Sequence, residues 1–107
     1  MGEKESVING LKKFLKNLSK NMNIDRIFLF GSRASGEPDR DSDIDLIIVS
    51  PDFRGTNFIE RGAKMYDYWT LNYPVDFLCY TPEEFNELKK QITIVKEAVE
   101  NGIEIMQ

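Results

Sequence analysis

Two short apolar runs joined by a glycine-serine turn constrain this chain more than any other feature of its sequence. Residues 27–30 are Ile-Phe-Leu-Phe, and residues 44–49 are apolar apart from Asp45. Short apolar runs bounded by turn residues are typical of buried strands. Gly31 ends the first run with a backbone that can turn sharply, and residues 32–35 can then begin a short helix whose free N–H groups suit a phosphate. The sequence therefore predicts a strand, a turn for phosphate and a second strand.

The second strand opens with two carboxylates. Asp43 and Asp45 are two residues apart, so their side chains lie on the same face of the strand. Two carboxylates side by side at a buried strand repel each other unless a cation or protons neutralise them. A divalent metal ion is the simplest explanation, although the pair taken alone could equally be helix caps or loop residues. Asp39 and Asp41 are interpreted as solvated loop residues.

These two segments match a known pattern. Gly-Ser-Arg-Ala at residues 31–34 is followed by Ser-Asp-Ile-Asp-Leu at residues 42–46. A Gly-Ser turn, a spacer and an Asp-x-Asp pair resemble the signature of the DNA polymerase β-like nucleotidyltransferase superfamily. The two segments are similar to its minimal nucleotidyltransferase branch, and the resemblance covers most of the chain.

The resemblance implies an activity and a set of catalytic carboxylates. A third carboxylate is expected on a later strand, and Asp76 in Val-Asp-Phe-Leu-Cys-Tyr matches it. The implied reaction transfers a nucleoside monophosphate from ATP or another nucleoside triphosphate to a hydroxyl group, with release of pyrophosphate. Asp43, Asp45 and Asp76 would hold two Mg²⁺ ions, and Asp76 is also the candidate general base.

The resemblance also assigns the nucleotide-binding residues to the turn. Gly31 and Ser32 would bind the β- and γ-phosphates with the N–H groups that follow them. Arg33 would either add positive charge there or point to solvent. Some members of the superfamily carry a basic residue where this chain has Ser35, which leaves a phosphate or partner contact open.

Three functions stay open at this point. The first is an enzyme that adenylylates a partner protein, because all three carboxylates are intact. Family members of this size are often encoded beside a small helical HEPN protein, so the resemblance implies a HEPN-like partner and a toxin–antitoxin pair. The second is a non-catalytic antitoxin that masks a helical partner, and the third is a subunit of an antibiotic-modifying enzyme. The sequence indicates neither the nucleotide nor the acceptor.

Composition excludes several other chemistries. The chain has no histidine, which removes imidazole ligands and Ser-His triads, and its single cysteine, Cys79, lies in an apolar run and is predicted to be a buried small hydrophobe. The net charge of −4 disfavours binding to nucleic acid, although an RNA acceptor stays open. No apolar run approaches the roughly 18 residues of a membrane span, so a cytoplasmic location is expected. Four lysines on the first helix are interpreted as a solvated face: Lys12, Lys13, Lys16 and Lys20.

Periodicity and turn residues predict the remaining elements of a single α+β nucleotidyltransferase domain over residues 1–107. Its polymerase β-like fold would have a mixed sheet of three main strands with helices packed on it. The aromatic stripe of the second helix is interpreted as core, and Gly102 as a helix cap. The expected helices are 6–21, 57–69 and 81–101 with a break near Thr93; the strands are 27–30, 43–49 and 73–80, with a short edge strand at 103–105.

The directions of the strands follow from the need to bring the site together. The Ser32 turn can meet Asp43 only if the first two strands are antiparallel, since a parallel pair would separate them by roughly 20 Å. Asp76 can join Asp43 only if the second and third strands are parallel. The helix between them permits this as a right-handed crossover.

Two competing motifs fail on their required positions. Gly31 and Gly36 have P-loop spacing, but Glu37 and Pro38 stand where a lysine and a hydroxyl are needed. The alternating aspartates from residue 39 to residue 45 suggest an EF-hand loop. Whether the loop is counted from Asp39 or from Asp41, it lacks the glycine and the glutamate that an EF-hand requires, so calcium binding of that kind is not expected.

Overall fold

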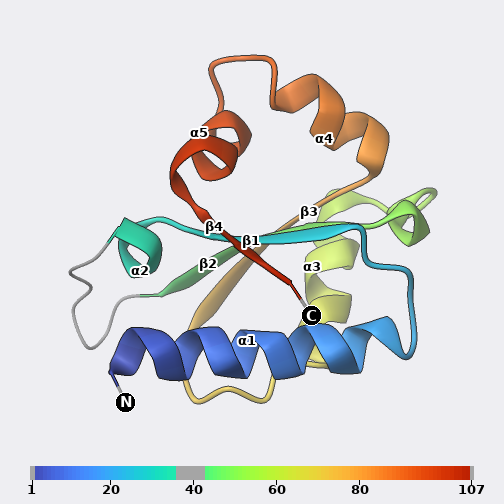
Figure 1. Cartoon of the computed structure of the whole chain (residues 1–107). Helices are drawn as coiled ribbons and strands as arrows, with labels where there is room; N and C mark the ends of the chain where they lie inside the picture. The colour runs from blue at the N-terminus through green and yellow to red at the C-terminus, as the bar shows by residue number, and fades with distance from the viewer. Residues whose placement is uncertain (1, 36–42, 107) are drawn as a thin grey trace.

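The computed structural model describes residues 2–35 and 43–106, so the interpretation of Asp39 and Asp41 and the failed P-loop positions lie outside the described residues. A four-stranded sheet forms the middle layer, with α1 and α3 on one face and α4 and α5 on the other (Figure 1). In chain order the elements are α1 (Glu3–Ser19), β1 (Arg26–Phe30), α2 (Ser32–Ser35), β2 (Ile44–Val49), the 3₁₀ helix η1 (Pro51–Phe53), α3 (Phe58–Tyr66), β3 (Val75–Tyr80), α4 (Pro82–Leu88), α5 (Ile94–Asn101) and β4 (Ile103–Ile105).

The sheet has the strand directions that the sequence predicts. Its order is β3-β2-β1-β4, with β1 and β2 antiparallel and β2 and β3 parallel. The predicted short edge strand at residues 103–105 is confirmed and pairs antiparallel with β1, so the sheet has four strands and not only the three main ones. The α+β class and the mixed sheet are confirmed. No helix in the described ranges is long and apolar enough to cross a membrane.

The central strand β2 is buried on both faces, as its nearly continuous apolar sequence predicts. Ile44, Leu46 and Ile48 face the larger core under α1 and α3, which also contains Phe14 and Met65. The alternate residues of β2 face a smaller core under α4 and α5, made mainly of Phe28, Phe30, Ile47, Val49, Phe85, Val95 and Ala98. The face with the smaller core carries Asp45, since side chains two apart share a face.

Local capping decides where the helices end. The predicted helix 81–101 is two helices: Thr93 accepts a hydrogen bond from the Lys96 amide and donates one to the Leu88 carbonyl, so it closes α4 and begins α5. Thr81 and Glu84 form a capping box at the start of α4. Gly102 caps α5, and there a Cβ would lie 2.4 Å from the Ala98 carbonyl oxygen. The break near Thr93 and the glycine cap are both confirmed.

Helix α3 covers the outer edge of the sheet. The backbone groups of Val75, Phe77 and Cys79 point away from β2, because the alternate residues of β3 pair with it. The Tyr66 hydroxyl donates to the Val75 carbonyl at 2.6 Å, and the Arg61 guanidinium donates to the Cys79 carbonyl at 3.2 Å. An edge strand whose carbonyls are occupied is a poor template for pairing with another strand. Cys79 is buried as predicted, and burial raises the pKa of its thiol to about 12.

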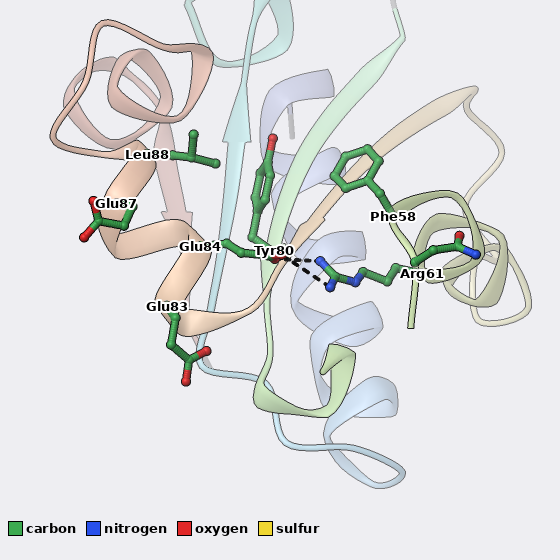
Figure 2. Close-up of a pocket in the computed structure, with 8 residues that line it drawn as sticks. Phe58, Arg61, Tyr80, Glu83, Glu84, Glu87 and Leu88 are labelled. Atoms are coloured by element: carbon green, nitrogen blue, oxygen red, sulfur yellow. Dashed lines mark hydrogen bonds and ion pairs between the residues drawn. The ribbon is translucent and has the colours of Figure 1, made fainter. Parts of the chain in front are cut away.

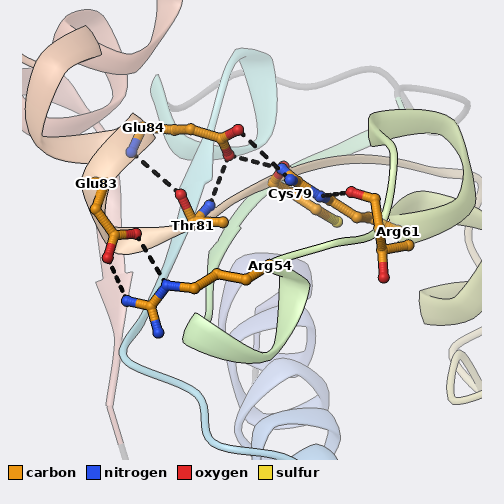
Figure 3. Close-up of polar contacts among 7 residues, drawn as sticks. Arg54, Arg61, Cys79, Thr81, Glu83 and Glu84 are labelled. Carbon is orange, nitrogen blue, oxygen red and sulfur yellow. Dashed lines mark hydrogen bonds and ion pairs between the residues drawn. The ribbon is translucent and has the colours of Figure 1, made fainter.

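Arg61 connects α3 to α4 as well as to the sheet. Its side chain is 92 % buried, and the guanidinium forms an ion pair with Glu84 at 2.6 Å (Figure 2) while its Nε donates to the Thr56 carbonyl at 2.7 Å. Glu84 also accepts from the Thr81 amide, and Figure 3 shows this shared network next to the exposed pair of Arg54 and Glu83. All three nitrogens of the buried guanidinium therefore donate hydrogen bonds within the fold.

Replacing Arg61 should destabilise the fold. Arg61→Met leaves the Cys79 and Thr56 carbonyls and the Glu84 carboxylate without their donor, and we expect the free energy of unfolding to fall by about 2 kcal/mol in urea titrations. Arg54→Met, which removes the exposed ion pair, is the matched control and should change little.

The ion pair of Arg61 and Glu84 should also make the effect of Arg61→Met on stability depend on pH. Hydrogen bonding to Arg61 lowers the pKa of Glu84 below its usual 4.5. The charged pair therefore stabilises the protein above that pH, and this stability is lost as the pH falls through the lowered pKa. Arg61→Met should reduce the loss of stability in acid, and equal acid sensitivity of both proteins would contradict the assignment.

Candidate active site

The register of the sheet brings Asp45 and Asp76 together. The two residues are partners on the adjacent parallel strands β2 and β3, and strands paired in this way lie about 4.8 Å apart. Asp43 comes two residues before Asp45, just ahead of β2. Asp43 and Asp76 are exposed, and Asp45 is partly buried. The predicted antiparallel pairing also places Phe30, at the end of β1, opposite Asp45.

The charge of Asp45 is disfavoured by its surroundings. Burial, and then the negative charges of Asp76 and Asp43, raise the pKa of its carboxyl above the usual 3.8. Within the described ranges no hydrogen bond or ion pair reaches any of these three carboxylates. Three like charges without a compensating partner favour the binding of a cation.

Gly31 is the point where the turn approaches the carboxylate. Its φ of +75° lies in the left-handed region, and a Cβ there would lie 2.5 Å from Oδ2 of Asp45. Any L side chain would therefore be strained by the backbone, and its Cβ would force the Asp45 carboxylate to move. The predicted sharp turn is confirmed, with a second reason for glycine that the sequence does not reveal.

A pocket of about 400 Å³ opens beside Asp45. Phe30, Gly31 and Asp45 line one side of it, and α5 lines the other with Ile94, Glu97 and Asn101. Sequence reasoning missed the α5 residues. The only signal was Gly102, whose missing Cβ lets the end of α5 approach the Leu29 carbonyl of β1.

Chemically, the carboxylates fit a divalent metal ion, although the structure does not form a complete ligand cluster. No three His, Cys, Asp or Glu side chains come together as a metal site among residues 2–35 and 43–106. The available donors are carboxylate oxygens, which Mg²⁺ prefers, and they carry uncompensated negative charge. Asp45 and Asp76 form the paired core of this donor set, with Asp43 within electrostatic reach of Asp45.

The structure does not bring Arg33 to the carboxylates. Its side chain is 98 % buried, forms an ion pair with Glu3 of α1 at 2.8 Å and stacks over the Tyr73 ring with its guanidinium carbon 4.9 Å from the centroid. These partners belong to the α1 side of the sheet, opposite the face of Asp45. Ser32 begins α2 directly after Gly31, next to the site.

A second and larger pocket lies at the other end of β3, between α3 and α4. It contains none of the predicted site residues. The uncompensated carboxylates and the glycine turn lie at the smaller pocket, which is therefore the candidate site.

Two solved structures share this fold over most of the chain. A putative nucleotidyltransferase from Sulfolobus solfataricus superposes with a TM-score of 0.68 and 20 % identity, covering 94 % of this chain and 80 % of that one. A mutant of the toxin–antitoxin pair MntA–HpeT superposes with a TM-score of 0.58 and 22 % identity, covering 92 % of this chain and 72 % of that one. At these identities the likeness establishes the fold.

The sequence establishes the family. The model of the nucleotidyltransferase domain matches residues 8–101, so the chain belongs to this family and is a nucleotidyltransferase enzyme. A protein of Methanocaldococcus jannaschii named a putative protein adenylyltransferase is 30 % identical over 71 residues, which cover 64 % of this chain and 72 % of that protein. The resemblance inferred from the Gly-Ser turn and the aspartates is thereby confirmed.

Removing the charge of Asp45 should stabilise the protein without metal. Asp45→Asn relieves burial and repulsion, so we expect a higher melting temperature than wild type at pH 7 in EDTA. Because the folded pKa is raised, this advantage should shrink as the pH falls through that pKa and should level off below 3.8. Asp25→Asn, an exposed aspartate outside the site, is the control. A less stable Asp45→Asn variant at pH 7 would contradict the electrostatic description.

Proposed function

We propose that this chain transfers AMP from ATP to a hydroxyl group of a partner protein. The observation that carries the proposal is the register pairing of Asp45 with Asp76, beside a glycine turn that touches the Asp45 carboxylate. The name of the M. jannaschii relative supports AMP as the transferred group and protein as the acceptor. The donor is tested by comparing ATP with the other nucleoside triphosphates.

Asp43, Asp45 and Asp76 are the residues that would hold Mg²⁺, as two ions in the arrangement the family resemblance implies. The metal ions would neutralise the triphosphate and polarise the attacking hydroxyl. Gly31 and the amides at the start of α2, with Ser32, would face the phosphates. Arg33 is left out of these contacts because its guanidinium is engaged with Glu3.

Asp76 and Asp45 have separate roles in the proposed transfer of AMP. The acceptor oxygen attacks the α-phosphorus of ATP and forms a new P–O bond, while the bond from that phosphorus to the bridging oxygen breaks and pyrophosphate leaves. Asp76 is exposed and can take the proton that the hydroxyl releases. Asp45, fixed between β1 and β3, would orient the reacting groups, since transfer requires the acceptor oxygen in line with the leaving oxygen.

A helical HEPN-like protein is our proposed acceptor, modified on a tyrosine hydroxyl. The shared fold with a toxin–antitoxin protein supports a protein partner, and the exposure of Asp43 and Asp76 leaves the site open to a large acceptor. An antitoxin that only masks its partner is the second candidate. It is favoured by one observation, the lack of a closed three-ligand metal cluster in the described part of the chain.

Mass spectrometry of the partner separates the two candidates. The product of the reading frame next to the gene of this chain is incubated with the enzyme, Mg²⁺ and each nucleoside triphosphate in turn. We expect the mass of one or more AMP groups on the partner with ATP, and none with Asp45→Asn, which should reduce transfer to background. Tight association and neutralisation by Asp45→Asn, with no added mass under any triphosphate, would leave masking as the function. AMP found on RNA instead would change the acceptor.

A further inference from the structure

The larger pocket has a volume of about 720 Å³ and lies where β3 ends between α3 and α4 (Figure 2). The ring of Tyr80 stands in its middle, with Phe58 of α3 on one side and Leu88 of α4 on the other. The Phe58 and Tyr80 ring centroids are 5.6 Å apart with the planes tilted by 46°. Two aromatic rings and a leucine thus form apolar walls that are open to solvent.

Helix α3 exposes apolar side chains at its start. Phe58, which lines the pocket, is 44 % exposed and the next residue, Ile59, is 83 % exposed, so the prediction that the apolar stripe of this helix is core is wrong for these two residues. Large apolar side chains gathered at a surface pocket are typical of a site that another molecule covers.

The rim of the pocket is acidic. Glu83, Glu84 and Glu87 line it together with Arg61. Arg61 pairs with Glu84 and donates to two backbone carbonyls, and Glu83 pairs with Arg54, so these charges are engaged within the fold. Glu87 has only a distant exposed contact, 3.9 Å to Lys90. Basic groups on the occupant would therefore complement the rim.

We propose that this pocket docks the acceptor protein through an apolar or aromatic side chain flanked by lysine or arginine. A side-chain anchor is favoured over an added strand, because α3 already occupies the outer carbonyls of Val75 and Cys79. Tyr80 and Asp76 lie on the same face of β3, four residues apart, which corresponds to about 13 Å. A segment anchored at Tyr80 and running along β3 thus brings a hydroxyl about four extended residues away to the carboxylates.

Arrays of short synthetic peptides test the docking chemistry without catalysis. Each peptide carries Phe, Leu or Ala as the central residue, with Lys, Glu or Ser as its neighbours and a tyrosine at varied spacing. We expect labelled protein to bind Phe or Leu flanked by Lys at least about tenfold more strongly than the Ala or Glu versions. Equal binding to all versions, or none, would overturn the proposal.

Three variants locate the binding on the protein. Phe58→Ser should weaken binding about tenfold, and Glu87→Lys should abolish the preference for Lys neighbours. Ile92→Ser, at a side chain 99 % exposed in the loop before α5, is the matched apolar control and should bind as wild type. Because Phe58 is on the surface, circular dichroism should show an unchanged fold. Binding insensitive to Phe58→Ser, or self-association that depends on Phe58, would contradict a partner segment at this pocket.

This inference rests on the proposed protein acceptor, and the two can fail separately. Asp45→Asn should bind the selected peptides normally and transfer nothing, whereas Phe58→Ser should transfer AMP to the partner with a raised KM and little change in kcat. Peptide binding without any AMP transfer would refute the proposed function and keep the docking site. AMP transfer unaffected by Phe58→Ser would refute the docking site and keep the proposed function.

Discussion

Strand β2 has an antiparallel neighbour on one side and a parallel neighbour on the other, and the site depends on its register with both. The antiparallel pairing returns the end of β1 to the start of β2, and the parallel pairing aligns the starts of β2 and β3. Asp45 is thereby placed between Phe30 and Asp76. A shift of one residue in either pairing would turn Asp45 into the larger core or separate it from Asp76. Because Asp45 is the only polar residue of β2, such a shift would bury its carboxylate among apolar side chains.

Contacts between α3 and the edge strand β3 also shape the pocket around Tyr80. Arg61 and Tyr66 of α3 occupy carbonyls of β3, and Arg61 also holds Glu84 at the start of α4. These contacts set the spacing of α3 and α4 and so leave the pocket around Tyr80. The same residues that stop strand pairing at this edge therefore shape the apolar pocket that we propose as the docking site.

Sequence reasoning predicted the features that arise from local patterns. The apolar runs and the glycine turn gave the strands, and the requirement that Asp43, Asp45 and Asp76 converge gave their directions. It could not predict contacts between distant segments, such as Arg33 with Glu3 or α5 beside Asp45, because nothing in the local sequence of one segment indicates which distant segment it contacts. No sequence pattern singles out Arg61, and only the fold shows that its side chain is buried.

Crystallography with Mn²⁺ and a non-hydrolysable ATP analogue tests the central claim most directly, because manganese scatters anomalously. The account predicts an anomalous peak within about 2.5 Å of carboxylate oxygens of both Asp45 and Asp76, with the triphosphate against the Gly31 turn. Manganese bound elsewhere, or a nucleotide seated between α3 and α4 with no metal at Asp45, would contradict it.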